Sequence, residues 1–146
     1  MGFHSPSKNC MTIGFSASNP LASTAYRFIK TNLPLTVAPL YAYFIPSRNS
    51  VVTGLHFSSI CDNNASVLAT NIYLRNVSTS TNYDCGLLNC TDFDAAIGGG
   101  RKGYYLMNDD LSIPLTKDNL YQFMYTTPAW VTAPTNWTAQ GILKYV

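Results

Sequence analysis

Hydrophobic and polar residues alternate along two stretches in the middle of the chain, residues 51–60 and 67–74. A period of two puts alternate side chains on opposite faces of an extended strand, so each stretch is predicted to be a half-buried β-strand. The residues between them, 61–64, are typical of a turn, and we predict that the two strands pair as a hairpin. In the first strand one face is predicted to carry Val51, Thr53, Leu55, Phe57 and Ser59, and the other Val52, Gly54, His56, Ser58 and Ile60.

Shorter extended runs, broken by Pro, Gly and Asn, lie on both sides of this pair. The candidate strands are residues 25–30, 35–37, 40–45, 103–107, 111–115, 120–127 and 138–146, whereas residues 75–102 are predicted to form a long irregular excursion. About eight short antiparallel strands with turns roughly every 8–12 residues are typical of an all-β fold. We expect a single jelly-roll-like β-sandwich over residues 12–146, preceded by a polar N-terminal arm, residues 1–11.

The composition supports this fold class. Charged residues make up only 11% of the chain, and neutral polar residues take their place, with 15 Thr, 13 Ser and 13 Asn. Thr favours pleated surfaces, while Asn and Ser favour turns. The acidic residues are all Asp, with no Glu, and Glu is the better helix former.

Charge and hydropathy argue against two kinds of partner. The net charge is +2, and Arg101 and Lys102 are the only adjacent basic residues, so no nucleic-acid binding is expected. No stretch approaches the roughly 20 apolar residues needed to cross a bilayer, so no membrane span is expected. A weakly charged surface repels little, which makes self-association easier.

The chain has four cysteines, Cys10, Cys61, Cys85 and Cys90. Cys85 and Cys90 enclose four residues, close enough to staple a turn, which would leave Cys10 to pair with Cys61. Two disulfides are the expectation, with one disulfide or buried free thiols as alternatives. Oxidised cysteines would place the domain outside a reducing cytoplasm. No histidine lies near the Cys85/Cys90 pair, so no zinc site is expected there. No other metal and no cofactor is expected for the chain.

Residues for catalysis are sparse. The two histidines are His4 in the arm and His56 in a strand, where a packed or surface side chain is the simpler interpretation. Asp109 and Asp110 have the pattern of a solvated turn.

Two other motifs resemble a calcium site and a phosphate-binding loop, but only in part. Asp92 and Asp94 could offer oxygen ligands to calcium, but the recognised calcium-loop pattern is missing. Residues 98–102, Gly-Gly-Gly-Arg-Lys, lack the G-K-[ST] ending of a phosphate-binding loop. We therefore expect a protein that is not an enzyme.

Two tryptophans, Trp130 and Trp137, lie in a Pro-rich connection before the last predicted strand. Rigid amphipathic rings on a connection serve binding contacts well, so both are candidate contacts to a carbohydrate or protein partner. The alternative is that they cap one end of the sandwich.

The order of segments resembles small β-sandwich proteins of tailed-bacteriophage particles. The resemblance rests on residues 46–55, which fit an apolar P-x-x-x-x-V-V-x-G-L start, on the I-P-L motif at residues 113–115, and on a closing strand at 141–146. It covers residues 40–146. The chain departs from the pattern at its end, which is Lys144-Tyr145-Val146 rather than acidic, and its cysteines are also unusual for the type. The resemblance implies a decoration, neck or fibre-associated role, without carrying over any individual site residue.

These observations predict a structural protein on the outer surface of a virus particle, which forms an oligomer, expected to be a homotrimer, and binds other capsid or tail proteins. The arm at residues 1–11 would order on assembly. One alternative is a receptor-binding head that recognises a host glycan or protein through Trp130 and Trp137. Another is an extracellular fibre subunit that assembles by a donated N-terminal strand.

Overall fold

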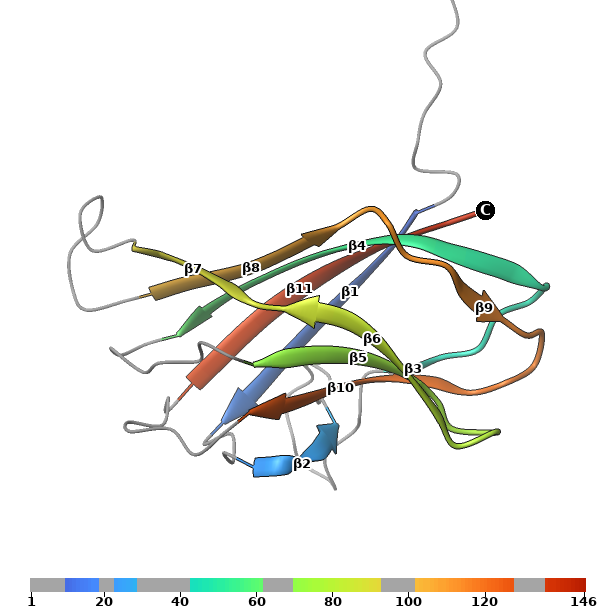
Figure 1. Cartoon of the computed structure of the whole chain (residues 1–146), viewed down its shortest axis with the longest axis horizontal. Coiled ribbons are helices and arrows are strands. Elements are labelled where there is room, and N and C mark those ends of the chain that lie inside the picture. The colour runs from blue at the N-terminus through green and yellow to red at the C-terminus, as the bar shows by residue number, and fades with distance from the viewer. Residues whose placement is uncertain (1–9, 19–22, 29–42, 62–69, 93–101, 128–135) are drawn as a thin grey trace, which may run out of the picture.

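The computed structural model describes residues 10–18, 23–28, 43–61, 70–92, 102–127 and 136–146. These residues form two antiparallel sheets that pack face to face as a β-sandwich (Figure 1). The predicted all-β fold is confirmed. No helix long and apolar enough to cross a membrane is found in the described part of the chain.

The first sheet has six strands. Its order is β1 (Cys10–Ser18), β11 (Asn136–Tyr145), β4 (Ser50–Cys61), β8 (Lys102–Asn108) and β7 (Asn89–Asp92), and β9 (Ile113–Leu115) pairs with the start of β4.

The second sheet has five strands. Its order is β2 (Ser23–Phe28), β10 (Tyr121–Thr127), β5 (Asn71–Asn76) and β6 (Thr81–Leu87), and β3 (Tyr43–Phe44) pairs with β10. Together the sheets hold more strands than the eight or so expected from the sequence.

The core lies between the two sheets and is built from alternate residues of their central strands. Leu55 and Phe57 of β4 are 0% and 1% exposed, and Leu74 of β5 and Phe123 of β10 are 0% exposed. Burying such side chains contributes about 1.5–3 kcal/mol each relative to exposure, so these strands supply much of the stability. The predicted alternation of β4 is confirmed from Leu55 to Ile60.

The alternation fails at one point of β4. Val52 was predicted to share a face with Gly54, yet it is fully buried in the core. The pairing of β4 with β11 shifts there, because Lys144 pairs with Gly54 and Tyr145 with Val52. The extra residue, Thr53, forms a β-bulge that reverses the side-chain direction.

The predicted hairpin between residues 51–60 and 67–74 is wrong. β4 pairs with β11, β8 and β9 in the first sheet, whereas β5 pairs with β10 and β6 in the second. The connection between β4 and β5 therefore crosses from one sheet to the other. Alternation identifies a strand with one buried face, but it carries no information about the neighbour to which that strand will pair.

The predicted irregular excursion at residues 75–102 is also wrong for its described part. Residues 81–87 are β6, which forms a hairpin with β5, and residues 89–92 are β7. The hairpin turn is closed by Thr79 N–H, which donates to Asn76 Oδ1 at 3.2 Å, and by Ser80 in the left-handed region at φ 57°. The Asn and Ser residues here build a tight turn between strands.

The predicted arm falls mostly outside the described residues. Its last two residues, Cys10 and Met11, are the first two of β1, where they pair with Lys144 and Leu143 of β11. Met11 packs against the core. Of the other predicted strands, residues 35–37 lie outside the described part of the chain.

Candidate interaction face

One side of the six-stranded sheet faces away from the core, and we call it the outer face. Its middle is set by the strand register, which aligns Thr12 with Ile142, Ile142 with His56, and His56 with Met107. The next row aligns Gln140 with Ser58 and Ser58 with Tyr105. The described residues of the outer face are Thr12, Gly54, His56, Ser58, Ile60, Asn89, Tyr105, Met107, Gln140, Ile142 and Lys144.

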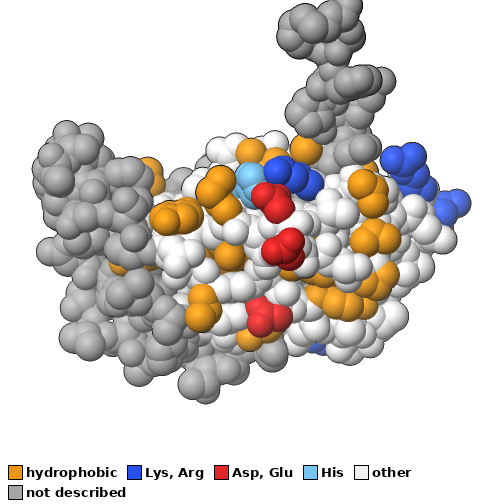
Figure 2. Space-filling view, turned by 45° about the horizontal axis from the view of Figure 1, so that its top comes forward, with side chains coloured by type: hydrophobic (Ala, Val, Ile, Leu, Met, Phe, Trp, Pro, Cys, Tyr) orange, Lys and Arg blue, Asp and Glu red, His pale blue; other side chains and the backbone are white. Residues whose placement is uncertain are grey.

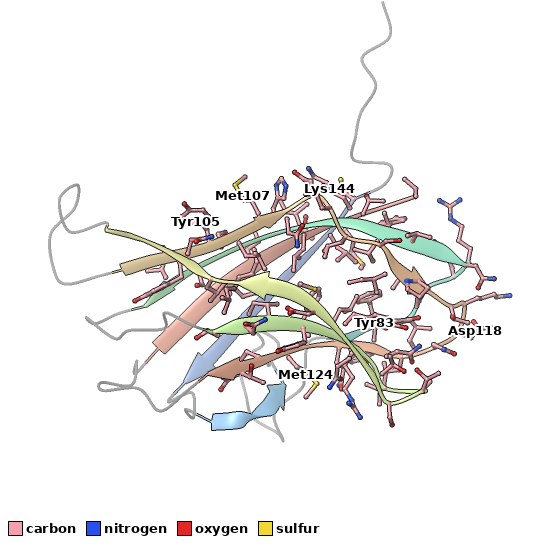
Figure 3. All side chains as sticks on the ribbon, in the orientation of Figure 1. Tyr83, Tyr105, Met107, Asp118, Met124 and Lys144 are labelled. Carbon is pink, nitrogen blue, oxygen red and sulfur yellow. The ribbon has the colours of Figure 1, made fainter. Side chains whose placement is uncertain are left out.

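The outer face carries exposed apolar side chains. Met107 is 65% exposed, Ile60 49% and Tyr105 40%. Tyr105, Met107 and Lys144 project from this sheet on the side away from the second sheet (Figure 3). Scattered apolar residues are normal on a protein surface, whereas a cluster on one face marks a site for contacts.

A shallow hollow of about 250 Å³ lies in the middle of this face. It is formed by neighbouring residues of β4, β8 and β11, so the sheet holds the backbone positions of its lining residues. Its lining is mainly apolar and uncharged and consists of His56, Phe57, Ser58, Tyr105, Met107, Gln140 and Ile142.

Three ionisable side chains meet at one end of the outer face. Lys144 Nζ donates to Asp109 Oδ1 at 3.1 Å, and His56 Nε2 lies 3.0 Å from the same oxygen. The Lys144 hydrogen bond, and then that of His56, lower the pKa of Asp109 below its ordinary value. Figure 2 shows histidine, lysine and aspartate side chains side by side, with apolar side chains next to them. We call these three residues the charged cluster.

The backbone makes room for the charged cluster at Gly54. A Cβ on Gly54 would lie 2.7 Å from Asp109 Oδ1, 3.3 Å from the Asn108 carbonyl oxygen and 3.4 Å from Lys144 Cδ. The Asp109 carboxylate therefore occupies the space that any other residue would fill with its side chain. Glycine at this position allows the carboxylate to reach both Lys144 and His56 across the sheet.

The side chains of the charged cluster neutralise one another. Its carboxylate oxygen is engaged by both an ammonium and an imidazole, so the described part of the outer face presents no acid or base without an oppositely charged neighbour. Within the described ranges, no group of three or more His, Cys, Asp or Glu side chains is placed to bind a metal ion.

Sequence reasoning did not find this cluster. His56 was interpreted as a packed or surface side chain and Asp109 as part of a solvated turn, because the two lie 53 residues apart. The one available signal was the predicted face of β4, which already grouped Gly54, His56, Ser58 and Ile60. Nothing in the sequence indicated that β8 and β11 would flank that face.

The two candidate contact tryptophans are not brought together by the described structure. Trp130 lies outside the described residues. Trp137 was predicted to lie in a connection, but its backbone belongs to β11, in register with Ala17 of β1 and Cys61 of β4. The connection is shorter than expected because the last strand begins at Asn136.

The structure does not support the predicted Cys85–Cys90 disulfide. Cys85 is a free thiol, 0% exposed, and burial raises its pKa to about 12. The register explains its position, because Ile72 pairs with Gly86 and Tyr73 with Asp84, which leaves Cys85 as the extra residue of a β-bulge. The bulge turns the thiol into the core. Cys90 follows on β7, in the other sheet, and its side chain, like that of Cys61, lies outside the described part.

Comparisons with known proteins place the chain in no family. No protein-family model matches the sequence, and no curated protein matches it either. Among solved structures, the chain is similar to one in the cyanophage Pam1 capsid asymmetric unit, at 10% sequence identity and a TM-score of 0.43. That similarity covers 94% of this chain and 84% of the capsid chain. None of these results assigns the chain to a family.

Proposed function

We propose that this protein is a non-enzymatic structural protein of a virus particle, an outer component that binds neighbouring subunits and stabilises their lattice. The observation that supports a contact with neighbouring subunits is the outer face of the six-stranded sheet. It combines exposed apolar side chains, a shallow hollow and charges that are already neutralised within the chain. A rigid sheet with such a face is suited to a lasting protein contact.

A partner on the outer face would remove apolar side chains from water. Burial of apolar surface contributes roughly 25 cal/mol per Å², and Met107, Tyr105 and Ile60 offer such surface on one face. Covering the charged cluster costs less than covering an unpaired charge, because Lys144 and His56 keep Asp109 as their partner. Burying a charge without a partner would oppose binding strongly.

An enzymatic role for the charged cluster fits the geometry less well. A general base must have its lone pair available to the proton it removes. Here Lys144 is an ammonium without a lone pair, and His56 Nε2 is directed at Asp109 Oδ1, which leaves only the other ring nitrogen, Nδ1, to act as a base. The cluster therefore resembles a surface ion-pair network in its geometry.

Particle association can be measured directly. Virus particles made from the genome that encodes this chain are purified through a density gradient and probed with antibodies raised against the recombinant protein. We expect the chain to migrate with intact particles and to be labelled from outside by immunogold electron microscopy. Recovery of the chain only in soluble fractions of the lysate would overturn the proposal.

The finer expectations from the sequence remain predictions. They include the homotrimer, the choice among decoration, neck and fibre-associated roles, and the binding of a host glycan or protein through Trp130 and Trp137. The same gradient, run on particles that carry Met107→Lys, tests whether the outer face holds the chain on the particle. Leu87→Lys is the matched control, because Leu87 is also an exposed apolar residue, 52% exposed, on a strand of the other sheet.

A further inference from the structure

We infer that the outer face of the six-stranded sheet is the surface through which one copy of this chain binds a second copy. The inference rests on the proposed function, in which this face is a contact between subunits, and it names the partner. Three observations support it, namely the extent of the face, its charge, and the presence on it of both an exposed Met107 and an apolar hollow.

The extent of the face is close to what a stable protein contact needs. Strands lie about 4.8 Å apart and rise ~3.3 Å per residue. Four strands along the seven residues of β8, with the four residues of β7, therefore project to roughly 500 Å². A corrugated sheet has more accessible surface than its projection. The face therefore approaches the ~800 Å² that each partner buries in a standard interface.

The charge of the face suits a partner that is also nearly neutral. Lys144 and His56 are held against Asp109, so the described outer face has no strong field to attract a nucleic acid or an acidic peptide. A second copy brings the same neutral face and a net charge of only +2. The two copies can approach without strong repulsion.

The face also supplies both halves of an apolar contact. Met107 lines the hollow and projects at its edge, where it is 65% exposed, with Tyr105 beside it on the same strand. Methionine is unbranched and flexible, so it fills irregular apolar spaces well. When two outer faces meet, the projecting Met107 of one copy has an apolar hollow of matching chemistry on the other.

The outer side of the five-stranded sheet is less suited to such a contact. Its strands β5 and β6 carry polar side chains that bond across the ladder, from Asn71 Nδ2 to Asp84 Oδ1 at 2.7 Å and from Arg75 to Asn82 at 2.8 Å. The charged Asp84 and Arg75 are bonded here to neutral amides, whereas Lys144 of the outer face is bonded to the opposite charge of Asp109. Covering the five-stranded sheet would therefore cost more free energy per charge.

The experiment measures the mass of the purified full chain by light scattering and sedimentation over a range of concentrations. Wild type is expected to form a discrete oligomer, and Met107→Lys to weaken its association at least tenfold, because the lysine ammonium would be buried without a partner. Leu87→Lys should associate like wild type. A dimer supports the inference, because two copies of the same face meet about a two-fold axis. A trimer would contradict it, because each contact in a trimer joins two different patches.

Two further results would overturn the inference. One is a wild-type chain that stays monomeric at about 100 µM, a concentration at which a contact of even micromolar affinity forms. The other is Met107→Lys associating as tightly as wild type. If Met107→Lys fails to give the wild-type circular dichroism spectrum, Ile142→Lys on β11 replaces it.

The measurement of oligomer mass is independent of particle binding. A chain that forms the oligomer but stays off particles refutes the proposed function alone, and a monomer that binds particles refutes this inference alone.

Discussion

Gly54 and Asp109 lie so close that a Cβ on Gly54 would be 2.7 Å from Asp109 Oδ1. The same oxygen accepts from Lys144 at 3.1 Å and lies 3.0 Å from His56. The absence of a side chain at one position of β4 thus determines whether three ionisable groups from separate parts of the chain can meet.

Gly54→Ala is expected to push the Asp109 carboxylate away from Lys144 and His56. Because those hydrogen bonds hold the pKa of Asp109 down, the pKa should rise toward its ordinary value. The fold should tolerate the change, since the closest atom is the end of an exposed side chain. An NMR titration of the Asp109 carboxyl carbon measures the shift. An unchanged, low pKa of Asp109 in the variant would contradict this account.

The pH dependence of stability follows from the same group. The pKa of Asp109 is lower in the folded chain than its ordinary value of 3.8, so its contribution to stability is present above pH 3.8 and is lost as the pH falls through the folded pKa. Wild type should therefore be slightly more stable than Asp109→Asn at neutral pH, and the difference should vanish in acid. Urea unfolding at both pH values measures it. Added salt should reduce the difference at neutral pH, because the charged cluster is exposed. A difference in stability that persists in acid would argue against an ionic origin of this stabilisation.

Tyr121→Phe is expected to destabilise the fold by about 1–3 kcal/mol, because it leaves buried polar groups without their partner. The Tyr121 ring is fully buried and its hydroxyl accepts from Thr116 N–H at 2.7 Å. It also accepts from Asn76 Nδ2 at 3.2 Å and donates to the Pro114 carbonyl at 3.2 Å. Chemical denaturation measures the loss in free energy of unfolding.

Tyr43→Phe is the matched control for that substitution, since it removes the hydroxyl of a tyrosine that is 56% exposed. Surface changes of this kind are usually within about 0.5 kcal/mol of wild type. Equal effects of the two substitutions would mean that the Tyr121 hydroxyl does not hold β5, β9 and β10 together.

Cys85 is expected to resist alkylation in the folded protein and to react after unfolding. Its thiol is 0% exposed and its pKa is raised to about 12, so almost no reactive thiolate is present near neutral pH. Iodoacetamide labelling followed by peptide mass spectrometry, with and without urea, gives the modified fraction. A non-reduced peptide that joins Cys85 to Cys90 would show instead that the predicted disulfide forms.

The sequence by itself determined the fold class and the positions of most of the described long strands. Alternation located β4, and the expected last strand matches most of β11, because side-chain periodicity is a local property of the chain. It also placed Gly54, His56, Ser58 and Ile60 on one face before any partner strand was known. Local turn chemistry was available at residues 76–82 but was interpreted as irregular, so β6 was missed.

Only the tertiary structure decided which strands pair, where the bulges fall and which side chains meet. The sheet assignments of β4 and β5 depend on contacts between residues far apart in sequence, which no local period encodes. The bulges at Thr53 and Cys85 reverse the side-chain direction, one burying Val52 and the other burying a thiol expected in a disulfide. His56, Asp109 and Lys144 meet because three separate segments become neighbours in one sheet. Long-range packing, rather than local preference, therefore created the candidate interaction face.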